Sequence, residues 1–152
     1  MTDRPAVRLP DRDPAAFVRV NRVLSRVLRS PLARVLPLPL VVLRYTGRRT
    51  GRRYETPVAL HELDGQHLII TRSGWRVNFR ERSPLEVVHR GRLRTGHGRL
   101  VEDHDEAARV MARLLEVGGP RTVGLEIDKG HRATHDELVA TRTSVLLVDL
   151  DS

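Results

Sequence analysis

The sequence predicts an α+β protein, built as an antiparallel β-barrel or β-sheet with helices at its ends. From residue 40 onward, short runs typical of β-strands follow one another, separated by turn residues. Two segments, 14–30 and 105–117, instead carry apolar residues at spacings of three and four, which is the period of an amphipathic helix. Strands and helices do not alternate singly, and this order argues against a Rossmann fold.

The composition is that of one globular domain. The chain has 152 residues, of which 39% are hydrophobic and 30% are charged. We expect a single domain over residues 1–152, with the polar residues 1–13 as a mobile arm. The chain contains no cysteine, which excludes disulfides and cysteine-based zinc sites. Because we find neither a signal peptide nor an apolar run approaching ~20 residues, we expect a cytoplasmic protein.

The net charge is +8 and is carried almost entirely by arginine. This balance favours anionic partners such as phosphorylated cofactors or acidic lipids. Aromatic residues make up only 3% of the chain, which leaves few rings to stack on bases, so we expect no specific nucleic-acid partner. The basic helix predicted at 14–30 has two interpretations. It covers a sheet, or it lies peripherally on an anionic membrane surface.

The predicted elements can be placed along the chain. Strands are predicted at 40–46, 54–63, 66–71, 85–89, 93–101 and 144–150. Asp64-Gly65 is the strongest hairpin signal. Pro57 indicates an edge strand or a bulge, and Gly96 and Gly98 indicate a bulge in the strand 93–101.

Helices are also predicted outside the two amphipathic segments. The segment 75–80 is predicted as a short helix or turn, and a further short helix is predicted near 135–141. Asp13-Pro14 is a start signal for the first helix, and either Asp103 or Asp105 is expected to cap the helix at 105–117. Gly118-Gly119-Pro120 is expected to end that helix.

The stretch 41–57, VVLRYTGRRTGRRYETP, carries the clearest chemical signal. Thr46-Gly47 and Thr50-Gly51 are turn pairs, and four arginines lie on or beside this turn: Arg48, Arg49, Arg52 and Arg53. Glycine lets a ligand approach the backbone closely, and guanidinium groups match phosphate and carboxylate oxygens. The pattern therefore predicts an anion site, while a solvated basic hairpin remains the alternative.

A second informative patch is the segment Thr71-Arg72-Ser73-Gly74-Trp75. It offers two hydroxyl groups, a guanidinium and a free backbone N–H beside the lone tryptophan. If the strands 40–46 and 66–71 are neighbours, this patch and the basic turn line one crevice. Such a crevice suits an extended ligand with a flat ring and a phosphate tail. The alternative is that Trp75 only fills the core.

Catalytic and metal motifs are missing from the sequence. We find no GxSxG, P-loop or GxGxxG pattern, so no catalytic residue is assigned. His131 and His135 have the i, i+4 spacing of two metal ligands. However, no glutamate lies between them as a metalloprotease requires, and we expect no metal site.

Four motifs, in order, resemble the deazaflavin-dependent nitroreductase family, a group of small actinobacterial split-barrel proteins related to the flavin reductases. Thr46-Gly47-Arg48-Arg49-Thr50-Gly51 matches the T-G-R-[KR]-[ST]-G motif, and Arg53 and Pro57 follow it. The later matches are Asp64-Gly65, Trp75, Asn78, Phe79 in place of a leucine, and Pro84. The resemblance covers roughly residues 17–101 and the last strand.

The resemblance implies a split β-barrel that binds coenzyme F420, a deazaflavin with a phosphate and a polyglutamate tail. The residues it implies for the tail are Arg48, Arg49, Thr50, Gly51 and Arg53, with Pro57 beside them. Those it implies along the ring and linker are Thr71, Arg72, Ser73, Gly74, Trp75 and Asn78. Family members transfer a hydride from reduced F420 to quinones, nitroaromatics or other conjugated acceptors. A small hydrophobic acceptor and a homodimer are therefore expected here.

Two departures from the family pattern leave an alternative open. Gly74 and Trp75 are adjacent, where the family has several intervening residues, so the pocket is more open or the ring sits differently. The segment 118–142 contains no aromatic residue, whereas the better-known reductases carry tyrosines there. The alternative is a non-catalytic protein, or one that binds FMN, haem or a lipid-like molecule on the same fold.

Overall fold

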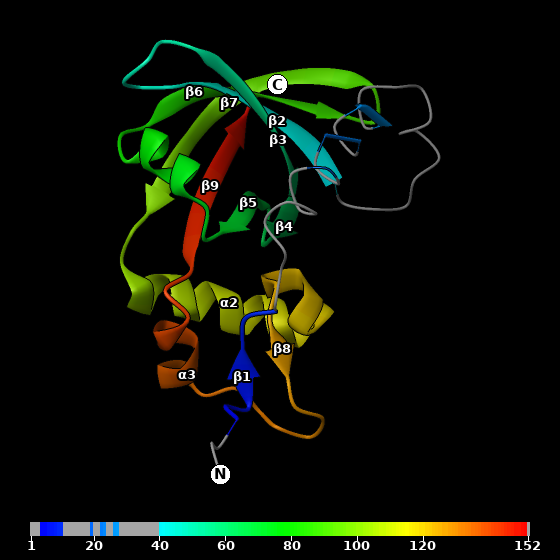
Figure 1. Cartoon of the computed structure of the whole chain (residues 1–152), viewed down its shortest axis with the longest axis vertical. Coiled ribbons are helices and arrows are strands. Elements are labelled where there is room, and N and C mark those ends of the chain that lie inside the picture. The colour runs from blue at the N-terminus through cyan, green and yellow to red at the C-terminus, as the bar shows by residue number, and fades with distance from the viewer. Residues whose placement is uncertain (1–3, 11–18, 20–21, 24–25, 28–39, 152) are drawn as a thin grey trace.

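The computed structural model describes residues 4–10, 19, 22–23, 26–27 and 40–151. Within them, seven antiparallel strands form one curled sheet in the order β3-β2-β6-β7-β9-β5-β4 (Figure 1). The strands are β2 (Leu40–Thr46), β3 (Arg53–Ala59), β4 (His61–Leu63), β5 (Gln66–Thr71), β6 (Ser83–His89), β7 (Arg92–Val101) and β9 (Ser144–Leu150). This half-barrel with few helices confirms the predicted α+β split-barrel class.

The remaining elements lie mostly on one side of the sheet. The helices α2 (His104–Gly118) and α3 (His135–Ala140) pack together, beside a small sheet of β1 (Val7–Arg8) and β8 (Glu126–Ile127) (Figure 1). Two 3-10 helices, η2 (Gly74–Phe79) and η3 (Pro120–Val123), complete the described part. No helix of the described segments is long and apolar enough to cross a membrane.

Two apolar clusters share β9, which explains how the layers join. One lies within the curled sheet and includes Val41, Phe79 and Leu146. The other lies between the sheet and the helices and includes Met111, Leu138 and Val145. Because successive side chains of a strand point to opposite faces, Val145 and Leu146 reach different clusters. β9 therefore couples the helical layer to the sheet that carries the basic turn.

Several local predictions are confirmed. Asp64 and Gly65 have φ values of 51° and 80° at the turn between β4 and β5, as a hairpin of this type requires. Pro57 lies on the edge strand β3, opposite Val42 of β2. Asp103 caps α2 by accepting a hydrogen bond from the Asp105 amide at 2.9 Å. The predicted strand 54–63 is wrong in one respect, because it breaks at Leu60 into β3 and β4.

The bulge predicted from Gly96 and Gly98 is wrong. The pairing of β7 with β6 and with β9 runs through both glycines without interruption. A Cβ atom at Gly96 would overlap the carbonyl oxygen of Asp149. At Gly98 it would lie 2.9 Å from Phe79 Cδ1. These glycines therefore make room for a close neighbouring strand and for η2, which is the other common reason for glycine in a strand.

The N-terminal predictions fall partly outside the described residues. Residues 1–13 were predicted as a mobile arm. Within this segment, Val7 and Arg8 form the strand β1, which pairs with Ile127 and Glu126 of β8. Arg8 also forms an ion pair with Asp128 at 2.6 Å. Most of the predicted helix 14–30 lies outside the described part, but its five described residues are helical: Arg19, Arg22, Val23, Arg26 and Val27.

We predict that Gly96→Ala destabilises the protein by about 1–3 kcal/mol, because β9 must move away from β7 to accommodate the new methyl group. Chemical denaturation measures this change. Gly74→Ala is the matched control, since a Cβ atom there meets no atom within 4 Å, and its effect should stay within about 0.5 kcal/mol. Equal stability of the two variants would show that the close approach at Gly96 is not a constraint.

Candidate functional site

The basic turn between β2 and β3 is closed by its own backbone. The Gly47 amide donates to the Arg52 carbonyl at 2.7 Å, and the Gly51 amide donates to the Gly47 carbonyl at 2.9 Å. Gly51 has a φ of 67°, which glycine adopts readily. A Cβ atom at Gly47 would lie 2.8 Å from both Thr50 Oγ1 and the Tyr54 ring. The turn thus has a defined shape rather than that of a loose hairpin.

Asn78 links this turn to η2. Its Oδ1 accepts a hydrogen bond from the Arg48 amide at 2.8 Å, and its Nδ2 donates to the Trp75 carbonyl at 2.8 Å. A weaker contact joins the Arg48 guanidinium to the Val77 carbonyl at 3.3 Å. The resemblance implied a cofactor-binding role for Asn78. In this structure both ends of its amide are engaged in positioning the turn.

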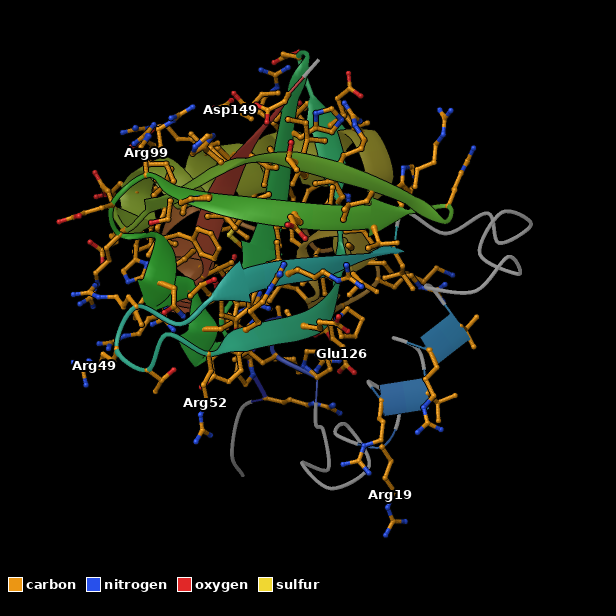
Figure 2. The ribbon with its side chains drawn as sticks, turned by 90° about the horizontal axis from the view of Figure 1, so that it is seen from above. Arg19, Arg49, Arg52, Arg99, Glu126 and Asp149 are labelled. Carbon is orange, nitrogen blue, oxygen red and sulfur yellow. The ribbon has the colours of Figure 1, made fainter. Side chains whose placement is uncertain are left out.

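The arginines of the turn differ in how far they are engaged. Arg53 forms an ion pair with Glu86 at 3.0 Å. Arg49 and Arg52 are exposed, and their side chains extend away from the ribbon (Figure 2). No described residue makes an ion pair or hydrogen bond with either of these two guanidinium groups. Thr50 is engaged locally, with its Oγ1 3.2 Å from the Tyr54 hydroxyl. Arg49 and Arg52 are therefore the cations of this turn that remain available to a ligand.

The four aromatic side chains of the described residues gather beside the turn. Tyr45 is central, since its ring centroid lies 5.6 Å from Tyr54, 5.9 Å from Trp75 and 5.8 Å from Phe79. Burial, and to a lesser extent the neighbouring Tyr54, raises the pKa of Tyr45. Trp75 packs against the cluster within the sheet and also lines a cavity. Trp75 therefore packs in the core and also borders a cavity, and its role as a site residue stays a prediction.

Three of these rings line two separate cavities. The first, which we call the turn cavity, has a volume of about 440 Å³. It is lined by residues 47–50, Tyr45, Tyr54, Val77, Asn78 and Arg80. The second, the β3–β5 cavity, has a volume of about 570 Å³. It is lined by residues 9–10, 56–59, 70–73 and 121–124, with Leu40, His61 and Trp75.

The single crevice expected from the sequence is therefore replaced by two cavities. β2 and β5 are not neighbours, because β6, β7 and β9 lie between them in the sheet. Thr71, Arg72, Ser73, Trp75 and Pro57 line the β3–β5 cavity, whereas Arg48, Arg49, Thr50 and Asn78 line the turn cavity. The other predicted site residues, Gly51, Arg53 and Gly74, line neither.

Sequence reasoning missed several lining residues. The wall of the β3–β5 cavity at 121–124 belongs to η3, in a segment without strong periodicity. His61 was also missed. Burial lowers its pKa below 6.5, and a hydrogen bond with the Thr122 backbone partly offsets this. The tyrosines of the turn cavity, Tyr45 and Tyr54, could have been found from the strand pairing, because they are directly opposite each other in β2 and β3.

The histidines considered as metal ligands lie elsewhere and have other partners. His131 Nε2 is 2.9 Å from Glu137 Oε1, and His135 Nε2 is 2.9 Å from Asp105 Oδ1. Glu137 also completes a capping box with Thr134 at the start of α3. Among the described residues, no group of three or more histidine or acidic side chains has the geometry to hold a metal ion.

We predict that Asn78→Ala loosens the basic turn. The loss of two hydrogen bonds at a partly buried position should cost about 1–2 kcal/mol of stability. Amide hydrogen exchange at Arg48 should accelerate by about tenfold or more, because its acceptor is gone. Thr95→Ala is the control, since it removes one hydrogen bond to Asp151 away from both cavities. Unchanged exchange at Arg48 would contradict the link.

The chain is similar to known proteins in sequence and in fold. Residues 17–120 match the sequence model of the family described as F420H(2)-dependent quinone reductase. No curated protein matches the chain. The solved structure of an F420-H2 dependent reductase, FDR-A, is similar at 15% identity and a TM-score of 0.48, covering 73% of this chain and 94% of that one.

Two further solved structures are similar. One, described as a domain-swapped dimer, has 17% identity and a TM-score of 0.50, covering 90% of this chain and 100% of that one. The other, an FAD and heme binding protein from Mycobacterium smegmatis, has 16% identity and a TM-score of 0.45, covering 83% of this chain and 64% of that one. At such identities a structural likeness supports the fold alone, and here that support comes from the domain-swapped dimer with its TM-score of 0.50.

The family match spans more than half of the chain and confirms the family expected from the motifs. The chain belongs to the F420H(2)-dependent quinone reductase family, and it is therefore an F420-dependent reductase with coenzyme F420 as its cofactor.

Proposed function

We propose that the protein transfers a hydride from reduced F420 to a quinone, a nitroaromatic or another conjugated hydrophobic acceptor. The observation that carries this proposal is that Arg48 and Arg49 line one cavity, while Trp75 and the segment 70–73 line a second one along the same strand β3. An F420 molecule has a matching division, with an anionic tail and a flat ring system. Reduced F420, when bound, supplies the hydride, and the acceptor takes up that hydride together with a proton.

Two elements, β3 and η2, contribute lining residues to both cavities. Along β3, Tyr54 lines the turn cavity, whereas Thr56 and Val58 line the β3–β5 cavity. Residues at i, i+2 and i+4 of a strand share one face, so these side chains form a continuous row. Along η2, Trp75 and Val77 likewise divide between the two cavities. An extended ligand that follows β3 can therefore reach both.

The turn cavity suits the tail of F420. Arg48, Arg49 and Arg80 line it, and none of its described lining residues is acidic. Arg49 is the strongest candidate donor, because its guanidinium is exposed and no described residue occupies it. Thr50 and the Gly51 amide border the same turn. Arg53 would have to exchange Glu86 for the ligand, so we assign it a supporting role. Arginine forks at this position would bind phosphate or carboxylate oxygens.

The β3–β5 cavity suits the ring and the acceptor. Pro57 and Trp75 provide apolar surface, and Thr71, Arg72 and Ser73 provide polar groups. The Ser73 amide donates to Thr71 Oγ1 at 3.1 Å, which fixes the end of β5. In this proposal these residues orient the ring and exclude water from one face of it. Gly74 lines neither cavity, so we assign it no contact with the ligand.

We predict that the double substitution of Arg48→Ala and Arg49→Ala weakens F420 binding by about 100-fold or more, since each charge-assisted contact contributes about 1.5–3 kcal/mol. Fluorescence quenching of F420 measures the affinity. Arg92→Ala with Arg94→Ala is the control, because these two exposed arginines of β7 line neither cavity. Unchanged affinity in the first variant would show that the turn is only a solvated hairpin.

The same titration addresses the alternative of a protein for FMN, haem or a lipid-like ligand. That alternative is motivated by η3, which places Arg121 and Thr122 rather than aromatic rings at the β3–β5 cavity. Tight binding of FMN or haem without binding of F420 would favour it over hydride transfer from F420.

Peripheral membrane contact through residues 14–30 belongs to the proposal as well. Arg19, Arg22 and Arg26 are exposed in the described part of this segment, and Val23 is 62% exposed among them. We predict that Arg22→Glu with Arg26→Glu abolishes sedimentation with anionic lipid vesicles, because charge attraction is lost. Zwitterionic vesicles are the control. Equal sedimentation with both vesicle types would contradict this contact.

A homodimer is likewise proposed. It is supported by the similar structure described as a domain-swapped dimer. Sedimentation equilibrium of the purified protein determines the oligomeric state.

A further inference from the structure

The charged side chains that line the β3–β5 cavity are all cationic. Two arginines, Arg72 and Arg121, line it, and none of its described lining residues is an aspartate or glutamate. Burial lowers the pKa of His61, so this histidine is mostly neutral near pH 7 and the arginines carry the positive charge. A cavity meant only for neutral hydrophobic molecules gains nothing from a cation such as Arg121, because a charge near an apolar ligand loses hydration without compensation.

The two arginines are held differently. Arg72 is half-buried, and its Nη2 donates to the Val123 carbonyl at 3.0 Å. This bond ties the end of β5 to η3. Arg121 is exposed on η3, and no described residue makes a hydrogen bond or ion pair with its guanidinium. Arg72 therefore contributes to the wall, whereas Arg121 has all of its donors available to a ligand.

Arg121 nevertheless has a fixed backbone. The Gly124 amide donates to the Arg121 carbonyl at 3.2 Å, and the Leu125 amide donates to the Pro120 carbonyl at 3.1 Å. The Thr122 hydroxyl donates to the Gly119 carbonyl at 2.6 Å. Gly119 and Gly124 flank the turn with φ values of 79° and 64°. The cation is thus presented to the cavity from a well-braced turn.

The rest of the cavity surface is mainly apolar. Pro57, Val58, Ala59, Ile70 and Trp75 contribute to it from β3, β5 and η2. A volume of about 570 Å³ lies within the range of roughly 300–1,000 Å³ that is typical of small-molecule sites. The surface therefore combines room for a flat apolar body with an available guanidinium at η3.

We propose that the acceptor of this enzyme is an anionic conjugated molecule, with a flat apolar body against the β3 and Trp75 surface and a carboxylate or sulfonate-like group on Arg121. Arg121 is then a specificity-determining residue. This inference rests on the proposed hydride transfer from F420. In the proposed function the tail of F420 lies in the turn cavity, where Arg48 and Arg49 are its cations. Arg121 is consequently left for a different anion.

The test compares two quinones that share a ring system, 1,4-naphthoquinone-2-sulfonate and neutral 2-methyl-1,4-naphthoquinone. The ratio of their kcat/KM values is measured for the wild-type protein and for Arg121→Gln. Because both proteins are given the same two acceptors, differences in reduction potential cancel. We expect the ratio of anionic to neutral acceptor to fall about tenfold, as expected for one lost charge-assisted contact. Arg121→Lys should restore part of the ratio.

Three further measurements complete the test. Arg109→Gln, an exposed arginine of α2 that lines neither cavity, should keep the wild-type ratio. The affinity of Arg121→Gln for F420 should stay within about twofold of the wild-type value. Higher salt should lower the wild-type ratio, because an exposed charge contact is screened. An unchanged ratio in Arg121→Gln, or a parallel loss of F420 affinity, would overturn the inference.

Failure of the proposed hydride transfer from F420 would give a result distinct from failure of the Arg121 inference. In that case the wild-type protein would bind no F420 and reduce neither quinone. Binding of the two quinones to the protein without F420, followed by NMR, still decides the role of Arg121. Stronger binding of the sulfonate that depends on Arg121 would support the anion site, and equal binding of both quinones would overturn it.

Discussion

The amide of Asn78 is the interaction on which the site depends most. Its two ends hold the Arg48 amide and the Trp75 carbonyl, so one side chain sets the spacing between the basic turn and η2. The turn comes from the β2–β3 hairpin, and η2 follows β5, a strand at the other end of the sheet. Without the two hydrogen bonds of Asn78, only the curvature of the sheet and weaker contacts would hold the basic turn near η2.

The closure of the sheet explains why the link is possible. The edge strand β3 and the end of β5 approach each other across the open side of the half-barrel, and residues of both line the β3–β5 cavity. Within the aromatic cluster, Tyr45 and Tyr54 line the turn cavity, whereas Trp75 lines this cavity, and the ring centroids of Tyr45 and Trp75 are 5.9 Å apart. Two cavities whose aromatic lining residues contact one another can hold two chemically different parts of one ligand.

The sequence predicted what is encoded locally. The strands β2, β5 and β9 and the Asp64-Gly65 hairpin were predictable because apolar runs and turn residues coincide there. The basic turn was predictable from the same kind of signal. The β1–β8 pair was not, because two-residue strands have no period, and the role of Gly96 depends on a strand about 50 residues away. The η3 wall with Arg121 was missed for the same reason, since only tertiary packing brings it to β5.

The central claim is that one F420 molecule occupies both cavities along β3. Backbone amide chemical shifts during titration with F420 test this most directly. We expect the amides of the turn at 47–51 and those at 71–75 to shift together, with one shared affinity. Shifts confined to one of the two segments, or with two different affinities, would contradict it.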